Sequence, residues 1–391
     1  MVMLATLPGR TQGLGLITEP LLADFGFDRV QFAQMNLWAT LAGALFCFPA
    51  GWLLDRFGLR GTTAGLIALL AAVVSALALS TGGPLLFLIL LTLTRGLGQS
   101  ALSIASITSV GKRFGSEVGQ PMALFSVCLS LLFALAFGWI GYSVRTMGWR
   151  AAWLQVAAFL AFAIAPLVLF SLRVKPVSRR DSTAPQPLAG LTLREALRTR
   201  AFWTFAASAA LFNLVSSGLG LFNESVLAER GFGQKMFHLF LAITTLLSLG
   251  GQFLCGWLSS RVSYQRLTAF ALGLYALALL MLPSIKTPVE LFCVCLLIGV
   301  AGGMIIVIFF AIWSVAFGRK HLAQIQGAAQ CLTVISSALG PVLFAKVFAV
   351  AHSYSPLLLT IALIVIAIAL LSLTTPFPKS SQMDLEPCPA S

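Results

Sequence analysis

Long apolar runs limit what this chain can fold into more than any other feature. Runs of about 20 residues recur along the sequence, and a helix of that length crosses the ~30 Å hydrocarbon core of a bilayer. Of the 391 residues, 59% are hydrophobic and only 9% are charged, whereas a soluble domain carries roughly 25% charged residues. The ten-residue alternating segments of a membrane β-barrel do not occur. The sequence therefore predicts an all-α polytopic membrane protein.

The apolar runs and the breaks between them predict twelve transmembrane helices. Their approximate limits are 2–22, 30–54, 61–81, 84–111, 119–144, 151–172, 201–223, 235–259, 266–283, 289–316, 322–348 and 355–374. We expect no cleavable signal peptide, because the first run contains Arg10 and leads directly into the second.

A repeat divides the chain into two halves. Segment 13–27, GLGLITEPLLADFGF, returns at 218–232 as GLGLFNESVLAERGF, with nine of fifteen residues identical. The same offset of 205 relates Gly51 to Gly256 and Trp149 to Tyr354. Because each half has an even number of spans, the halves are parallel repeats, an arrangement suited to alternating access. A repeat kept only as a static scaffold is the alternative.

This division predicts four regions. Residues 1–172 form an N-terminal six-helix bundle, 173–200 a basic cytoplasmic linker, 201–375 a C-terminal six-helix bundle and 376–391 a disordered cytoplasmic tail. Within the linker, Thr192 and Glu195 have the spacing of a capping box, which predicts a short helix before span 7.

The basic residues indicate how the protein sits in the membrane. The net charge is +13, and sixteen Lys and Arg residues fall on the side of the loop after span 2, against seven on the other side. Positive charge collects on the cytoplasmic side, so both termini are expected there, in a multi-pass protein of the plasma (inner) membrane. The surplus is explained by topology and by contact with anionic lipids, and we expect no nucleic-acid partner. We also expect a monomer.

The loop between spans 2 and 3 contains a recognisable motif. It reads GWLLDRFGLRG and contains Gly51, Asp55, Arg56, Gly58 and Arg60. This resembles the signature of the major facilitator superfamily, G-x-x-x-D-R-x-G-[RK]-[RK], at five of six defining positions, with a leucine in place of the first closing basic residue. The resemblance extends to the twelve-span plan with a basic central loop.

The resemblance implies a conformational latch on the cytoplasmic side. In this family the Asp contacts the start of helix 11 and a basic residue that ends helix 4. Here Asp55 would meet the chain near His321 and either Lys112 or Arg113. A solvated loop is the alternative interpretation. The second-half copy has Ser260 in place of the Asp, so its latch is expected to be weaker or absent.

Two arginines lie deep inside spans. Arg10 and Arg95 are about 13 Å and 16 Å from the nearest span end at ~1.5 Å per residue, close to the midplane. An unpaired arginine there costs roughly 2.5–3.5 kcal/mol on insertion scales. With no acidic residue at that depth, the pair predicts a positive cavity that binds an anion. The alternative is structural, with either arginine bound to helix-end carbonyls or hydroxyls. Pro8 and Gly9 are expected to loosen the helix before Arg10.

Further polar residues are candidates for substrate contact. They are Gln99, Asn36, Asn213 and Gln330. Each is alternatively a helix–helix hydrogen bond. Glu19 and Glu224 are repeat mates at the outer ends of spans 1 and 7. They are expected to take up a coupling proton or to form an outer gate, and hydrated helix-end carboxylates are the alternative.

Together these features predict a secondary transporter for a small organic anion such as a monocarboxylate, with protons as the coupling ion. The segment LREALRTRAFW before span 7 weakly resembles the monocarboxylate and oxalate–formate branch. The alternatives are a proton-driven drug exporter and a non-transporting membrane sensor or scaffold. We expect no enzyme activity, catalytic residue, metal site or cofactor, and we interpret Cys293 and Cys295 as small buried residues.

Overall fold

The computed structural model describes residues 2–27, 29–114, 117–171 and 190–378. These residues form helices and short connections, and their one β-type contact is an isolated bridge between Gly190 and Gly318. The all-α prediction is therefore confirmed. Most of the expected linker, 173–189, and the expected disordered tail from 379 onward lie outside the described residues.

The chain divides into two compact units, which we describe separately. Unit 1 contains residues 1–113, 128–187 and 321–334, and unit 2 contains residues 114–127, 188–320 and 335–391. The division follows the two sequence halves, except that each half contributes one short segment to the other unit. The beginning of the fifth span belongs to unit 2, and the beginning of the eleventh span belongs to unit 1. The bundle boundaries predicted from the sequence stay predictions.

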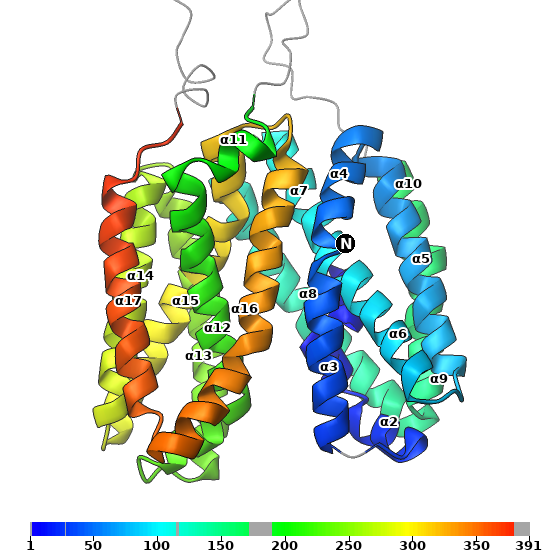
Figure 1. Ribbon diagram of the computed structural model, residues 1–391, viewed down its shortest axis with the longest axis horizontal. Helices are drawn as coiled ribbons and strands as arrows, with labels where there is room; N and C mark the ends of the chain where they lie inside the picture. Colours follow the sequence, from blue (N-terminus) through cyan, green and yellow to red (C-terminus); the bar gives the residue numbers. More distant parts are fainter. Residues whose placement is uncertain (1, 28, 115–116, 172–189, 379–391) are drawn as a thin grey trace, which may run out of the picture. The chain divides into compact units, whose positions relative to one another are not determined.

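The helices of the first half are shown in blue to green in Figure 1. They are η1 (Leu4–Gly9), α1 (Thr11–Gly15), α2 (Thr18–Phe25), α3 (Arg29–Ala44), α4 (Cys47–Phe57), α5 (Leu59–Leu79), α6 (Pro84–Thr94), η2 (Arg95–Leu102), α7 (Ser103–Phe114), α8 (Gly119–Met147), α9 (Trp149–Phe159), η4 (Leu160–Ile164) and α10 (Ala165–Ser171). Within unit 1, α5 packs on α6 and α9, α3 packs on α6, and η1 packs on η2.

The second half has longer uninterrupted helices (Figure 1). They are α11 (Leu193–Leu197), α12 (Arg200–Ala228), α13 (Gln234–Leu258), α14 (Tyr264–Met281), η5 (Leu282–Ser284), α15 (Pro288–Phe317), α16 (Leu322–Ala351) and α17 (Ser355–Thr374). Within unit 2, α15 packs on α12, α13 and α14, and α17 packs on α12 and α14. Thr192 and Glu195 form the predicted capping box at the start of α11.

Eleven helices of the described residues are long and apolar enough to cross a membrane. The first predicted span is not among them, because it is divided into η1, α1 and α2. Pro8 lies inside the 3₁₀ helix η1, and Arg10 is extended, with φ −93° and ψ 152°. The predicted loosening at Pro8 and Gly9 is thus confirmed, and it goes as far as a complete break in the helix.

Glycines allow the irregular first span to pack closely against the fourth. An added Cβ at Gly9 would lie 2.5 Å from the Thr94 carbonyl oxygen and 2.8 Å from the Cα of Gly98. The fourth span is itself irregular here, because η2 is a π-helix between α6 and α7. Two distorted backbones therefore touch at the level of Arg10 and Arg95.

Candidate functional site

Arg95 is held at the centre of this crossing. It begins η2 and is 1% exposed. Its Nη1 donates to the Gly9 carbonyl oxygen (3.2 Å), to Thr11 Oγ1 (3.1 Å) and to Gln99 Oε1 (3.0 Å). Its Nη2 donates to Asn36 Oδ1. The guanidinium therefore connects the first, second and fourth spans, and no carboxylate of the described residues pairs with it.

The break in the first span explains why Arg95 can bind there. A carbonyl at the end of a helical segment lacks its usual intrahelical donor, and buried backbone groups need partners inside a membrane. Arg95 donates the missing hydrogen bond to the Gly9 carbonyl oxygen. One donor, Arg95 Nε, is buried and has no partner among the described residues.

Arg10 has a more open environment. It is half-buried, and its Nε donates to Thr6 Oγ1 at 2.7 Å. Its Nη2 lies 3.2 Å from Ser103 Oγ and 3.7 Å from Met3 Sδ, and the guanidinium carbon is 5.5 Å from the centre of the Phe133 ring. In the described part of the chain no group accepts a hydrogen bond from Nη1, so Arg10 keeps two N–H donors available.

The other predicted contact residues divide into two groups. Gln99 and Asn36 join Arg95, as described above. Asn213 donates to the Ala209 carbonyl of its own helix at 2.8 Å. Gln330 is half-buried on α16 and bonds to neither arginine. The side chains of Glu19 and Glu224 lie outside the described residues, so their gating or proton-coupling role stays a prediction.

Asp55 forms a buried acidic site in unit 1 with three hydrogen-bond donors. Its side chain is 4% exposed, and Oδ1 accepts from Lys112 Nζ at 2.7 Å. The backbone amides of Ala323 and Gln324, at the start of α16, donate to the two carboxylate oxygens at 3.4 Å and 3.0 Å. Gly51 permits the close approach, because a Cβ there would lie 2.7 Å from the Ala323 carbonyl oxygen. A carboxylate at a helix N-terminus is favoured by the helix dipole.

The basic residues of this loop have separate contacts. Arg56 lies over the Trp52 ring at 5.0 Å and near Phe57, and Arg60 donates to the Leu169 carbonyl. Gly58 has a positive φ of 84°, which allows the turn between α4 and α5. Of the two predicted basic partners of Asp55, Lys112 makes the ion pair, whereas Arg113 is an exposed residue near the end of α7.

Two acidic residues that we did not single out from the sequence make contacts between the first and last spans of each half. Asp24 accepts from Trp149 Nε1 (2.6 Å) and Arg150 Nε (3.2 Å). Glu229 accepts from Ser353 Oγ and from the Tyr354 amide at 3.1 Å. Asp24 and Glu229 are 205 residues apart, as are Trp149 and Tyr354. The repeat offset could therefore have identified both sites, each joining the end of the first span of its half to the start of the last span.

These paired sites predict unequal effects on stability. Glu229→Gln should lower the midpoint of thermal unfolding more than Asp24→Asn, because the Glu229 side chain is 19% exposed and that of Asp24 is 43% exposed. Both carboxylates accept hydrogen bonds and form an ion pair; a hydrogen bond to a charged group contributes roughly 1.5–3 kcal/mol, and exposure to water lowers the contribution of an ion pair to about 0–1 kcal/mol. Unfolding of the purified protein in detergent, followed by intrinsic fluorescence, measures both. Equal shifts would contradict this assignment.

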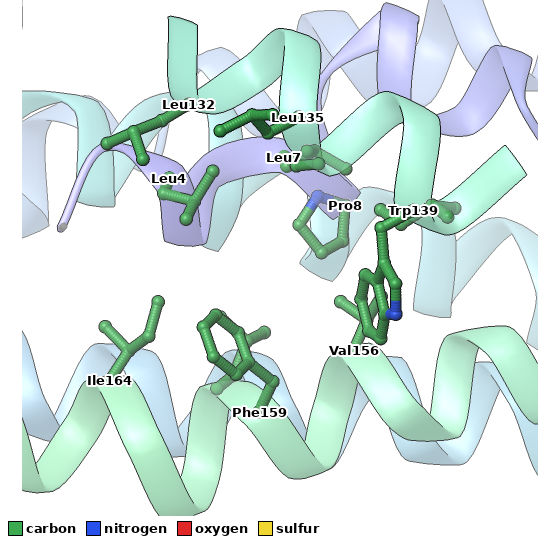
Figure 2. Close-up of a pocket in the computed structure, with 12 residues that line it drawn as sticks. Leu4, Leu7, Pro8, Leu132, Leu135, Trp139, Val156, Phe159 and Ile164 are labelled. Carbon is green, nitrogen blue, oxygen red and sulfur yellow. The ribbon is translucent and has the colours of Figure 1, made fainter. Parts of the chain in front are cut away.

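A separate cavity of about 310 Å³ lies between η1, α8 and the α9–η4 segment of unit 1 (Figure 2). Its lining is almost wholly apolar and includes Leu4, Leu7, Leu135 and Phe159. Neither Arg10 nor Arg95 is among the lining residues. The cavity therefore lacks the charge expected of an anion site, and it is distinct from the arginine cluster.

Comparison with known proteins identifies the family. The apolar helices define a multi-span membrane protein, and the family and structural matches given next identify it as a transporter rather than an enzyme. The sequence profile described as Major Facilitator Superfamily matches residues 2–341, and the chain belongs to this family. A curated relative, an uncharacterized 38 kDa protein in the 23S RNA operon of Thermoproteus tenax, is 26% identical over 97% of this chain and 93% of its own length.

Solved structures support the same fold. The transporter FucP in its outward conformation matches with a TM-score of 0.70 and 17% identity, covering 96% of this chain and 97% of its own. The human organic anion transporter MFSD10 (TETRAN) matches with a TM-score of 0.68 and 18% identity, covering 96% of both chains. At these identities the similarity shows the fold alone. The proposed link to the monocarboxylate branch stays a prediction.

Proposed function

We propose that this protein is a secondary active transporter that moves a small organic anion, such as a monocarboxylate, by alternating access coupled to protons. The observation that carries the proposal is the environment of Arg10. It is half-buried near the middle of the first span, has no carboxylate partner among the described residues, and keeps Nη1 available. A carboxylate is the natural acceptor for such a donor.

Arg95 has a different role in this proposal. Its 1% exposure and its four partners make it a positioning residue that fixes the broken backbone beside Arg10. The substrate then meets a pre-arranged guanidinium, and little of the binding free energy is spent on ordering the site. The description of the structural neighbour MFSD10 as an organic anion transporter supports this substrate class.

Three further parts of the proposal come from the sequence. The protein works as a monomer in the cytoplasmic (plasma) membrane, with both termini inside and lipids as its other partners. Asp55 and the start of α16 act as the cytoplasmic latch. Glu19 and Glu224 are the candidate groups for proton uptake or the outer gate, because no acidic residue occurs at the depth of the arginines.

Uptake into proteoliposomes tests the substrate class. With a panel of radiolabelled carboxylates, we expect saturable uptake by the wild type that increases with an inward proton gradient. Arg10→Gln should reduce uptake at least tenfold, since a charge-assisted hydrogen bond is worth about 1.5–3 kcal/mol. Arg145→Gln, at an exposed arginine outside the cluster, is the matched control and should transport normally.

Other outcomes would separate the parts of the proposal. Full activity of Arg10→Gln would contradict the proposal that Arg10 binds the anion. Uptake that responds to membrane voltage but not to pH would exclude proton coupling and leave the rest of the proposal in place. Efflux of lipophilic cations with no carboxylate uptake would favour the drug exporter that we considered as the alternative.

A further inference from the structure

An aromatic pair lies beside Arg10. Phe133 is under the Arg10 guanidinium at 5.5 Å, and its ring centre is 5.7 Å from that of Phe137, one turn further along α8. Both rings are half-buried, as Arg10 is. All three residues belong to unit 1. A guanidinium and two aromatic rings therefore form one continuous row with accessible surface.

The neighbours of this row determine which hydrogen-bond donor of Arg10 is available to a ligand. Thr6 and Ser103 occupy the Nε and Nη2 donors of Arg10, so Nη1 is the donor left for a ligand. A ligand bound at Nη1 extends either toward the hydroxyls of Thr6 and Ser103 or toward the aromatic rings. On the aromatic side, the faces of Phe133 and Phe137 offer contacts for a flat ring, and aromatic pairs prefer centroid separations of 4.5–7 Å.

We infer that the substrate site is built for a carboxylate attached to an aromatic ring. The inference rests on the proposed function and narrows it: Arg10 binds the carboxylate, and Phe133 and Phe137 bind the ring. The charge alone would accept any small anion. Ring–ring contact favours aromatic acids over saturated acids of the same charge and similar size.

Benzoate and cyclohexanecarboxylate form the matched pair of ligands that tests this inference. Both carry one carboxylate on a six-membered ring, but only benzoate has a π-face. We expect benzoate to bind the wild type roughly two- to tenfold more tightly, measured by isothermal titration on purified protein and by competition for uptake in proteoliposomes.

Variants assign the preference to the two rings. Phe137→Leu should lower the affinity for benzoate to about that for cyclohexanecarboxylate, with a smaller loss for the saturated acid because its contact with the side chain is only apolar, and Phe137→Tyr should retain the preference. Phe162→Leu is the control, because Phe162 is 83% exposed and is not part of the row. Binding of cyclohexanecarboxylate to each variant shows that the site is intact.

The outcomes distinguish this inference from the proposed function. Equal binding of both acids by the wild type, or an unchanged preference in Phe137→Leu and Phe133→Leu, would overturn the aromatic site while leaving an anion transporter in place. If neither acid bound and no carboxylate was taken up, both the aromatic site and the proposed anion transport would be overturned.

Discussion

Gly9→Ala is expected to separate the first and fourth spans and to destabilise the folded protein. The added methyl group would lie 2.5 Å from the Thr94 carbonyl oxygen and 2.8 Å from both the Gln99 amide nitrogen and the Gly98 Cα. All three are backbone atoms of helical segments, so no flexible side chain can move aside. Overpacking of this kind costs about 1–3 kcal/mol, and rigid backbone contacts favour the upper end.

The same substitution should also disturb the site. Arg95 donates to the Gly9 carbonyl, and Arg10 follows Gly9 directly in the chain. Any displacement of the backbone therefore moves both guanidinium groups. We expect a lower midpoint of thermal unfolding in detergent, and a loss of uptake that exceeds the loss of folded protein measured by size-exclusion chromatography.

Gly15→Ala is the matched control for this prediction. Gly15 ends α1 in the same broken span, but a Cβ there meets no heavy atom within 4 Å. It should fold and transport like the wild type. Normal stability of Gly9→Ala would contradict the close crossing of η1 and η2.

The fold was predictable because it depends on properties that single sequences carry. Apolar run length determines which segments span a membrane, and the repeat offset of 205 relates the halves. Even the break before Arg10 was indicated by Pro8 and Gly9, because proline lacks an amide donor and glycine adds backbone freedom. The completeness of that break was not predictable, since it also depends on the glycine contact with the fourth span.

The partners of the site residues were much less accessible to sequence reasoning. Arg10 and Arg95 look alike in the sequence, yet one is half-buried with a spare donor and the other is enclosed by four acceptors. The difference comes from helix packing between residues far apart in the chain, 86 positions for Gly9 and Arg95 and 93 for Arg10 and Ser103. Asp24 and Glu229 were missed because the repeat relates the two positions to each other but does not show that they contact Trp149 and Tyr354, 125 residues further along the chain.

Asp55→Asn is expected to release the start of α16. The carboxylate accepts from Lys112 and from the amides of Ala323 and Gln324. Asparagine keeps the shape but loses the charge, so both the ion pair and the interaction with the helix dipole disappear. The dipole interaction alone is worth up to about 2 kcal/mol in a partly buried site, and loss of a buried ion-pair partner costs roughly 3–5 kcal/mol.

Hydrogen exchange measures this release directly. In Asp55→Asn, the amides of the first turn of α16 should exchange at least tenfold faster, since each 1.4 kcal/mol corresponds to a factor of ten. Arg56→Gln is the neighbouring control: Arg56 is exposed and stacks on Trp52 without touching α16 in the contacts described above, so exchange there should stay at the wild-type rate. If Asp55→Asn left the exchange of Ala323 and Gln324 unchanged, the carboxylate would not hold the helix start. The latch would then have to depend on the packing of Gly51 against Ala323 alone.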